Sequence, residues 1–134
     1  MSKTGISNSF DHRASGYGRG EGSVCIIIKA TDDAKRDNYA IRAVVRGSGV
    51  NHVGRSQGIT LPDGKSQADL IDRVYAKAGL NPHETAYVEA HGTGTERGDP
   101  IEAESIASGM GSRSRGSDKP LYVGSVKSNF GEWK

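Results

Sequence analysis

The stretch from Ala86 to Glu102 limits the possible fold more than any other part of the chain. A short β-type run ends at His91, a loop rich in glycine and threonine follows, and a helix is expected to begin near Asp99 and Pro100. This strand–loop–helix order is typical of α/β proteins, in which ligands bind at the carboxyl ends of the strands. The pattern therefore predicts an α/β fold with His91 at the mouth of a site.

Three kinds of residue in this loop suit a ligand site. The imidazole of His91 can act as a base or as a hydrogen-bond donor near neutral pH. Gly92 and Gly94 allow a ligand to approach the backbone closely, and Thr93 and Thr95 offer hydroxyl groups. An ordinary histidine in a βα loop has the same layout, so the layout alone leaves both interpretations open.

Hydrophobic patterning predicts the remaining elements. The charged connector Asp32–Asn38 is expected to hold a helical turn, and a helix capped by Ser66 and ended by Gly79 is expected over Gln67–Ala78. Strands are expected where β-branched residues run together or alternate with polar ones: Ser23–Lys29, Tyr39–Gly47, Ala86–Ala90 and Pro120–Ser125. The first two of these strands could pair antiparallel, and Cys25 is expected to be buried in the first.

Composition narrows the classes of function. The 134 residues suit one domain, and 34% of them are hydrophobic before the 19 glycines are added. The net charge of +2, with both signs mixed, indicates neither a nucleic-acid partner nor a membrane partner. The chain has no long apolar run, and its single cysteine excludes an internal disulfide. We therefore expect a cytoplasmic protein in a reducing compartment, without a cofactor or a metal site.

Four motif-like blocks occur along the chain: Phe10–Gly22, Gly58–Pro62, Glu89–Glu102 and Val123–Asn129. In this order they resemble the motifs of the β-ketoacyl synthases, the condensing domains of polyketide and fatty-acid synthases, and the polyketide type most closely. The resemblance implies that residues 1–134 form one truncated ketosynthase-like domain. It also implies an α/β, partial thiolase-like fold, for which we expect one mixed sheet of order β-β-α-β-α-β with helices packed against it.

The resemblance also assigns roles to residues. Such synthases use a cysteine thiolate to carry the acyl chain, and two histidines to decarboxylate the malonyl unit and hold the enolate oxygen. His91 matches the first histidine and Lys127 matches the lysine of the last block, whereas Glu132 stands where the family has its second histidine. The family's nucleophile lies upstream of the Phe10 block, and Cys25, inside an apolar run, is expected to be a buried and therefore inert thiol. The resemblance thus implies His91, Lys127 and Glu132 as the catalytic set.

Other residues of the blocks receive lesser roles. Thr93, Thr95 and Asn129 are expected to contact the substrate, a polyketide or acyl thioester that a carrier protein could hold. Asp11 and Glu21 are expected to hold the Phe10 block through backbone hydrogen bonds. A solvated loop is expected around Arg113 and Arg115, with recognition of an acidic carrier protein as the alternative.

The predicted function is that of a truncated β-ketoacyl synthase-like protein of polyketide biosynthesis, unable to condense acyl thioesters alone. Two alternatives remain open. In the first, the chain is a stand-alone catalyst of hydrolysis, cyclisation or isomerisation, with His91 as base, Glu132 as acid and Lys127 as electrostatic anchor. In the second, it is a non-catalytic partner of a larger synthase. Because the apolar strands carry more surface than one helical layer covers, a homo-oligomer is expected.

Overall fold

The computed structural model describes residues 1–52, 62–111 and 115–133 of the chain. Most of the predicted block Gly58–Pro62, and Arg113, lie outside the described residues. The elements in chain order are β1 (Arg19–Gly20), α1 (Thr31–Arg36), α2 (Gly64–Ala78), η1 (Pro82–Glu84), β2 (Tyr87–Glu89), α3 (Gly98–Gly109), β3 (Tyr122–Gly124), α4 (Lys127–Phe130) and β4 (Glu132–Trp133).

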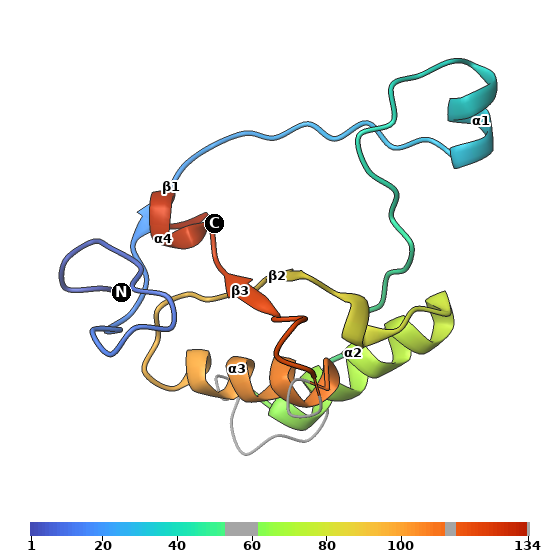
Figure 1. The fold of residues 1–134 in the computed structure, drawn as a ribbon. Coiled ribbons are helices and arrows are strands. Elements are labelled where there is room, and N and C mark those ends of the chain that lie inside the picture. The colour runs from blue at the N-terminus through green and yellow to red at the C-terminus, as the bar shows by residue number, and fades with distance from the viewer. Residues whose placement is uncertain (53–61, 112–114, 134) are drawn as a thin grey trace.

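The packed part of the molecule consists of α2 and α3 against the strand pair β2–β3 (Figure 1). The two strands are parallel, with Val88 opposite Val123. Because β2 and β3 leave their carboxyl ends at the same edge, the residues that follow each strand are brought together. The core beneath the strands is built from small and medium apolar side chains, with others packed around it: Ala90, Ile106 and Met110, surrounded by Ile71, Tyr75, Val88 and Leu121.

A second parallel pair, β1–β4, joins the N-terminal block to the end of the chain. Arg19 lies opposite Glu132 in this pair, and the Glu132 N–H donates to the Gly18 carbonyl at 2.6 Å. Gly131 enters β4 with a φ of +84°, and a Cβ there would lie 2.8 Å from the Arg19 carbonyl carbon. Only glycine fits such a position, which sets the direction from which Glu132 enters the site.

Helix α2 begins three residues earlier than predicted and has a different cap. Asp63, rather than Ser66, is the N-cap residue, and its carboxylate accepts from the Ser66 N–H at 2.9 Å. The predicted end is confirmed, because Gly79 adopts a left-handed conformation with φ of 63° and its N–H bonds back into the last turn. The predicted helix after Pro100 is also confirmed, as α3.

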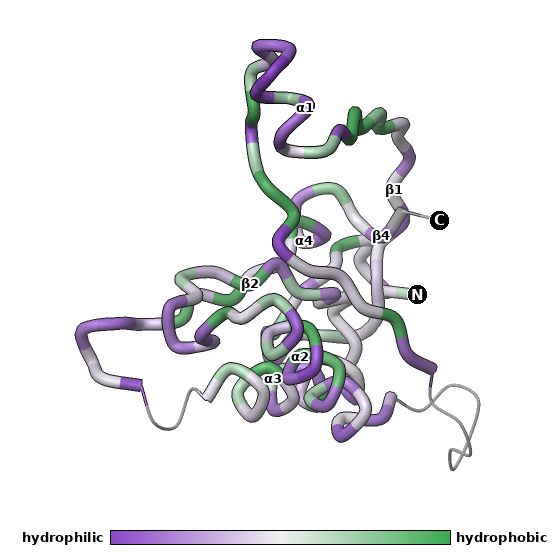
Figure 2. Tube along the Cα trace, turned by 90° about the vertical axis from the view of Figure 1, so that its right-hand side faces the viewer, coloured by the Kyte–Doolittle hydropathy of each residue, from purple (hydrophilic) through white to green (hydrophobic). Residues whose placement is uncertain are grey.

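The predictions of strands at Ser23–Lys29 and Tyr39–Gly47 are wrong. Both segments form the legs of a long excursion, residues 21–50, which carries α1 at its tip and leads away from the packed part (Figure 1). The legs are apolar, as the green stretches of Figure 2 show, yet Ile27 is 93% exposed and Cys25 is exposed too. Among the described residues no strand pairs with either leg, and most of their side chains are exposed, although Lys29 lies over the Tyr39 ring and Gly47 lies against α2.

The sheet order also differs from the prediction, because neither leg pairs with another strand. Within residues 1–52, 62–111 and 115–133, the strands form two parallel pairs, β1–β4 and β2–β3, and the single mixed sheet of order β-β-α-β-α-β is not found. The helical turn predicted between the two legs is present as α1. None of the described helices is long and apolar enough to cross a bilayer.

Candidate functional site

The backbone of His91 is held by a carboxylate from α3. Glu102 accepts from the His91 N–H at 2.6 Å through one oxygen and from the Gly92 N–H at 2.8 Å through the other. On the β3 side, the Ser125 hydroxyl donates to the His91 carbonyl at 3.2 Å. Hydrogen bonds to a charged acceptor are stronger than neutral ones, so the position of His91 is firmly determined while its ring remains exposed.

A second carboxylate of α3 organises the rest of the loop. Asp99 is buried, and its oxygens accept from the N–H groups of Gly94 and Thr95, each at 3.1 Å, and of Phe10 at 2.8 Å. These bonds offset the cost of burying the charge. They also tie the N-terminal block to the histidine loop, so two of the recognised motifs meet at one side chain.

The glycines of the loop serve close contacts within the chain. Gly92 has a φ of +43°, and a Cβ on it would lie 2.5 Å from the Ser125 Cβ. Gly94 has a φ of +78°, and a Cβ there would lie 2.8 Å from the Asn8 nitrogen. We expected these glycines to let a ligand approach the backbone. The close contacts that leave no room for a side chain are instead made by residues 8 and 125 of the same chain.

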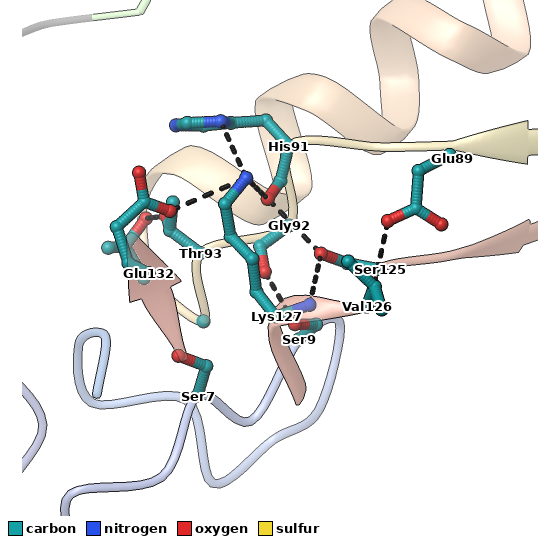
Figure 3. A network of polar contacts seen from close by, with 12 residues as sticks. Ser7, Ser9, Glu89, His91, Gly92, Thr93, Ser125, Val126, Lys127 and Glu132 are labelled. Carbon is teal, nitrogen blue, oxygen red and sulfur yellow. Dashed lines mark hydrogen bonds and ion pairs between the residues drawn. The ribbon is translucent and has the colours of Figure 1, made fainter. Parts of the chain in front are cut away.

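Lys127 brings the three predicted catalytic residues together (Figure 3). Its Nζ lies 3.1 Å from His91 Nδ1, 2.7 Å from the His91 carbonyl oxygen and 3.4 Å from Glu132 Oε2. An ammonium group has donors but no acceptor, so Nδ1 accepts and the ring carries its proton on Nε2. His91 therefore presents an N–H donor toward the outside of the cluster.

Glu132 approaches Lys127 from β4 (Figure 3). The side chains of Lys127 and Glu132 are 20% and 12% exposed. Glu132 Oε2 is itself buried and accepts no hydrogen bond from the described residues. The 3.4 Å contact with Nζ is an ion pair by distance, but it leaves the lone pairs of this oxygen available to a further donor.

Glu89, which sequence reasoning missed, orients the start of α4. Its carboxylate accepts from the Tyr87 hydroxyl at 2.5 Å and from the Val126 N–H at 2.7 Å. These hydrogen bonds, that of Tyr87 first, lower the pKa of Glu89, and the carboxylate in turn raises the pKa of Tyr87. Since Val126 directly precedes Lys127, this contact helps to aim the lysine. The contact joins positions 37 residues apart, so no local signal could have revealed it.

Comparison with known families identifies the family to which the chain belongs. The family described as "Beta-ketoacyl synthase, C-terminal domain" matches residues 42–134. The chain belongs to the β-ketoacyl synthase family. Its relatives include a highly reducing polyketide synthase of Preussia isomera, 52% identical over 131 residues, and a hybrid PKS-NRPS synthetase of Aspergillus niger, 54% identical over 131 residues. Each comparison covers 98% of this chain but only 5% and 3% of these relatives.

Solved ketosynthases have the same fold over this stretch. The ketosynthase from module 6 of the bacillaene synthase of Bacillus subtilis is 40% identical with a TM-score of 0.92, covering 98% of this chain and 24% of that one. An oxazolomycin ketosynthase domain of Streptomyces albus is 36% identical with a TM-score of 0.89, covering 98% and 22%. The predicted ketosynthase, thiolase-like fold is thereby confirmed at the level of the family.

Two of the predicted substrate-binding residues of this β-ketoacyl synthase chain, Thr93 and Thr95, line one pocket with His91, and the Thr93 hydroxyl donates to that of Thr95 at 3.5 Å. Thr93 and Thr95 are half-buried, and the Thr95 hydroxyl accepts from the Gly98 N–H at 3.1 Å, at the start of α3. Asn129 is exposed on α4. Contact of these three residues with a substrate stays a prediction.

Two loop predictions have clear outcomes. Asp11 holds its loop as expected, accepting from the Arg13 backbone N–H at 2.8 Å and from Arg13 Nε at 2.9 Å. Arg115, expected in a solvated loop, instead has a structural role. Its guanidinium donates to the carbonyls of Thr85, at 2.8 Å, and of Pro82, and so ties the connector before β2 to the segment before β3.

Proposed function

We propose that this chain carries the histidine–lysine part of a ketosynthase site and acts in polyketide biosynthesis on an acyl thioester. The observation that supports this proposal is the double contact of Lys127 Nζ with Nδ1 and the carbonyl oxygen of His91. It leaves the Nε2–H of an exposed ring free to donate to a thioester carbonyl. A fixed donor beside a cation favours the negative charge that develops on such an oxygen.

We further propose that the chain does not condense acyl thioesters by itself. Condensation in this family requires a cysteine thiolate, and the chain has one cysteine, Cys25. Cys25 lies on an exposed leg of the excursion, outside the loop and strands that hold His91 and Lys127. A complete site would require a thiol from another part of a ketosynthase.

The proposed acyl-binding role can be tested by titrating the ¹⁵N-labelled chain with a neutral acyl thioester of N-acetylcysteamine. Binding should shift the amide signals of residues 91–95 and 127, and His91→Ala should weaken it on the order of tenfold. His83→Ala, on η1, is the matched control and should bind as the parent does. Absence of any shift, or full binding by folded His91→Ala, would contradict the proposal.

A stand-alone catalyst is the second candidate, because Glu132 converges with Lys127 and His91. In this reading His91 exchanges a proton with a polyketide, Glu132 is the companion acid, and Lys127 anchors charge. Incubation of the chain with acyl thioesters and polyketide lactones would reveal turnover, which His91→Ala should abolish. Glu132→Gln should lower it on the order of 10²-fold. Binding without turnover favours the first candidate, and neither binding nor turnover favours a non-catalytic partner of a larger synthase.

A further inference from the structure

Glu132 changes the charge of the site as well as its shape. The family's second histidine is neutral or positive, whereas this chain places a carboxylate 3.4 Å from Lys127 Nζ. Because His91 Nδ1 accepts from Lys127, the imidazole counts as neutral in this arrangement. The formal charges of Lys127 and Glu132 then cancel, so the cluster has no net positive charge to offer an anionic group.

From this arrangement we propose that Glu132 makes the site select uncharged acyl groups and reject carboxylate-bearing ones of the malonyl type. The inference rests on the proposed acyl-binding role and specifies its substrate class. A substrate carboxylate that approached Lys127 would have to displace Glu132 or lie beside it. Both side chains are largely withdrawn from solvent, where repulsion between like charges is screened much less than at the surface.

The test compares two thioesters of N-acetylcysteamine that differ in charge, 3-hydroxybutyryl and malonyl, by ¹⁵N titration of the whole chain. The parent should bind the neutral thioester at least about tenfold more tightly than the malonyl thioester. Glu132→Gln keeps the shape and removes the charge, so it should bring the two affinities within about threefold, mainly by strengthening malonyl binding. Glu84→Gln, which removes an exposed carboxylate on η1, should leave the ratio unchanged.

The outcomes separate this inference from the proposed function. Equal affinity of the parent for both thioesters, or an unchanged ratio in Glu132→Gln, overturns the charge-selection role while acyl binding stands. If neither thioester binds to any folded variant, the acyl-binding role itself fails, and the inference with it. If Glu132→Gln does not fold, Glu132→His, which also removes the carboxylate, supplies the answer.

Discussion

The packed part around α2, α3, β2 and β3 and the excursion of residues 21–50 are equally apolar in places but differ in exposure. Ile106 of α3 is 5% exposed, whereas Ile27 of the first leg is 93% exposed. Both are isoleucines, so the difference does not come from the side chain. It comes from whether another element of the same chain lies opposite (Figure 2).

The excursion nevertheless follows the path of its family. The match to the module 6 ketosynthase includes 98% of this chain with a TM-score of 0.92, but only 24% of that longer chain. The C-terminal domain family begins to match at residue 42, within the second leg. The legs therefore keep the path that the family fold gives them, although within the described residues no strand pairs with either leg.

The largest expected effect contrasts two isoleucines. Ile106→Ala removes a side chain from the core and should lower the free energy of unfolding by roughly 2–5 kcal/mol. Ile27→Ala removes a side chain that the single chain leaves exposed and, at a protein concentration low enough to keep the chain monomeric, should change it by no more than about 0.5 kcal/mol. Urea unfolding followed by circular dichroism measures both. A large loss in Ile27→Ala would mean that the first leg is buried in solution.

The next largest effect concerns the carboxylate that joins the N-terminal block to the histidine loop. Asp99→Asn replaces an acceptor of several N–H groups by an amide, one end of which carries donors. We expect a loss of about 1–3 kcal/mol in the free energy of unfolding and shifted amide signals at Phe10 and Gly94. Glu96→Gln, at an exposed position three residues earlier, should cost no more than about 0.5 kcal/mol. Equal stability of the two variants would show that Asp99 does not tie the motifs together.

The sequence predicted well those features that depend on local pattern. The helices α2 and α3 and the strands β2 and β3 follow from periodicity and end signals. The family resemblance indicates His91, Lys127 and Glu132, which the fold brings together, while their catalytic roles stay a prediction. The burial of Cys25 was predicted wrongly, because an apolar run indicates that a segment suits burial but not where its partner lies. The hydrogen bonds of Glu89 with Val126 and of Asp99 with Phe10 join residues that are 37 and 89 positions apart in the sequence. No local pattern contains such contacts.

The exposed legs, unlike the packed part, should drive self-association of the chain. The unpaired legs present apolar side chains and backbone groups, which favour pairing with another chain. We therefore expect a homodimer or larger closed oligomer at micromolar concentration by sedimentation. The double substitution Ile26→Thr and Ile28→Thr keeps β-branched side chains with high β propensity. It should weaken association on the order of tenfold or more. Ile6→Thr, at an exposed residue outside the excursion, is the control, and a monomeric parent would refute the expectation.

Cys25 reports on the first leg directly. Because its thiol is exposed in the single chain, a disulfide reagent should modify it in the folded monomer, at high dilution, within about threefold of the rate in urea. An acyl thioester should leave no adduct by intact-mass analysis, because the thiol is not part of the His91 cluster. Slow labelling would place Cys25 under cover, most simply in an oligomer interface, and a stable acyl adduct would overturn the claim that the chain lacks a working nucleophile.

The smallest expected effect compares the caps of two helices. Helix α1, on the excursion, has no side-chain cap, whereas α2 begins with Asp63, whose carboxylate accepts from Ser66. Hydrogen bonding from Ser66, by its side chain first and by its backbone N–H second, lowers the pKa of Asp63. A carboxyl whose pKa is lower in the folded state stabilises that state above its unfolded pKa, near 3.9, and this contribution is lost as pH falls through the folded value.

Asp63→Ala should thus lower the melting temperature at pH 7, by less than Ile106→Ala does, and the difference from the parent should shrink in acid. Asp63→Asn, which can still cap, should retain most of the stability at both pH values, and a loss as large as that of the alanine variant would show that charge matters more than the hydrogen bond.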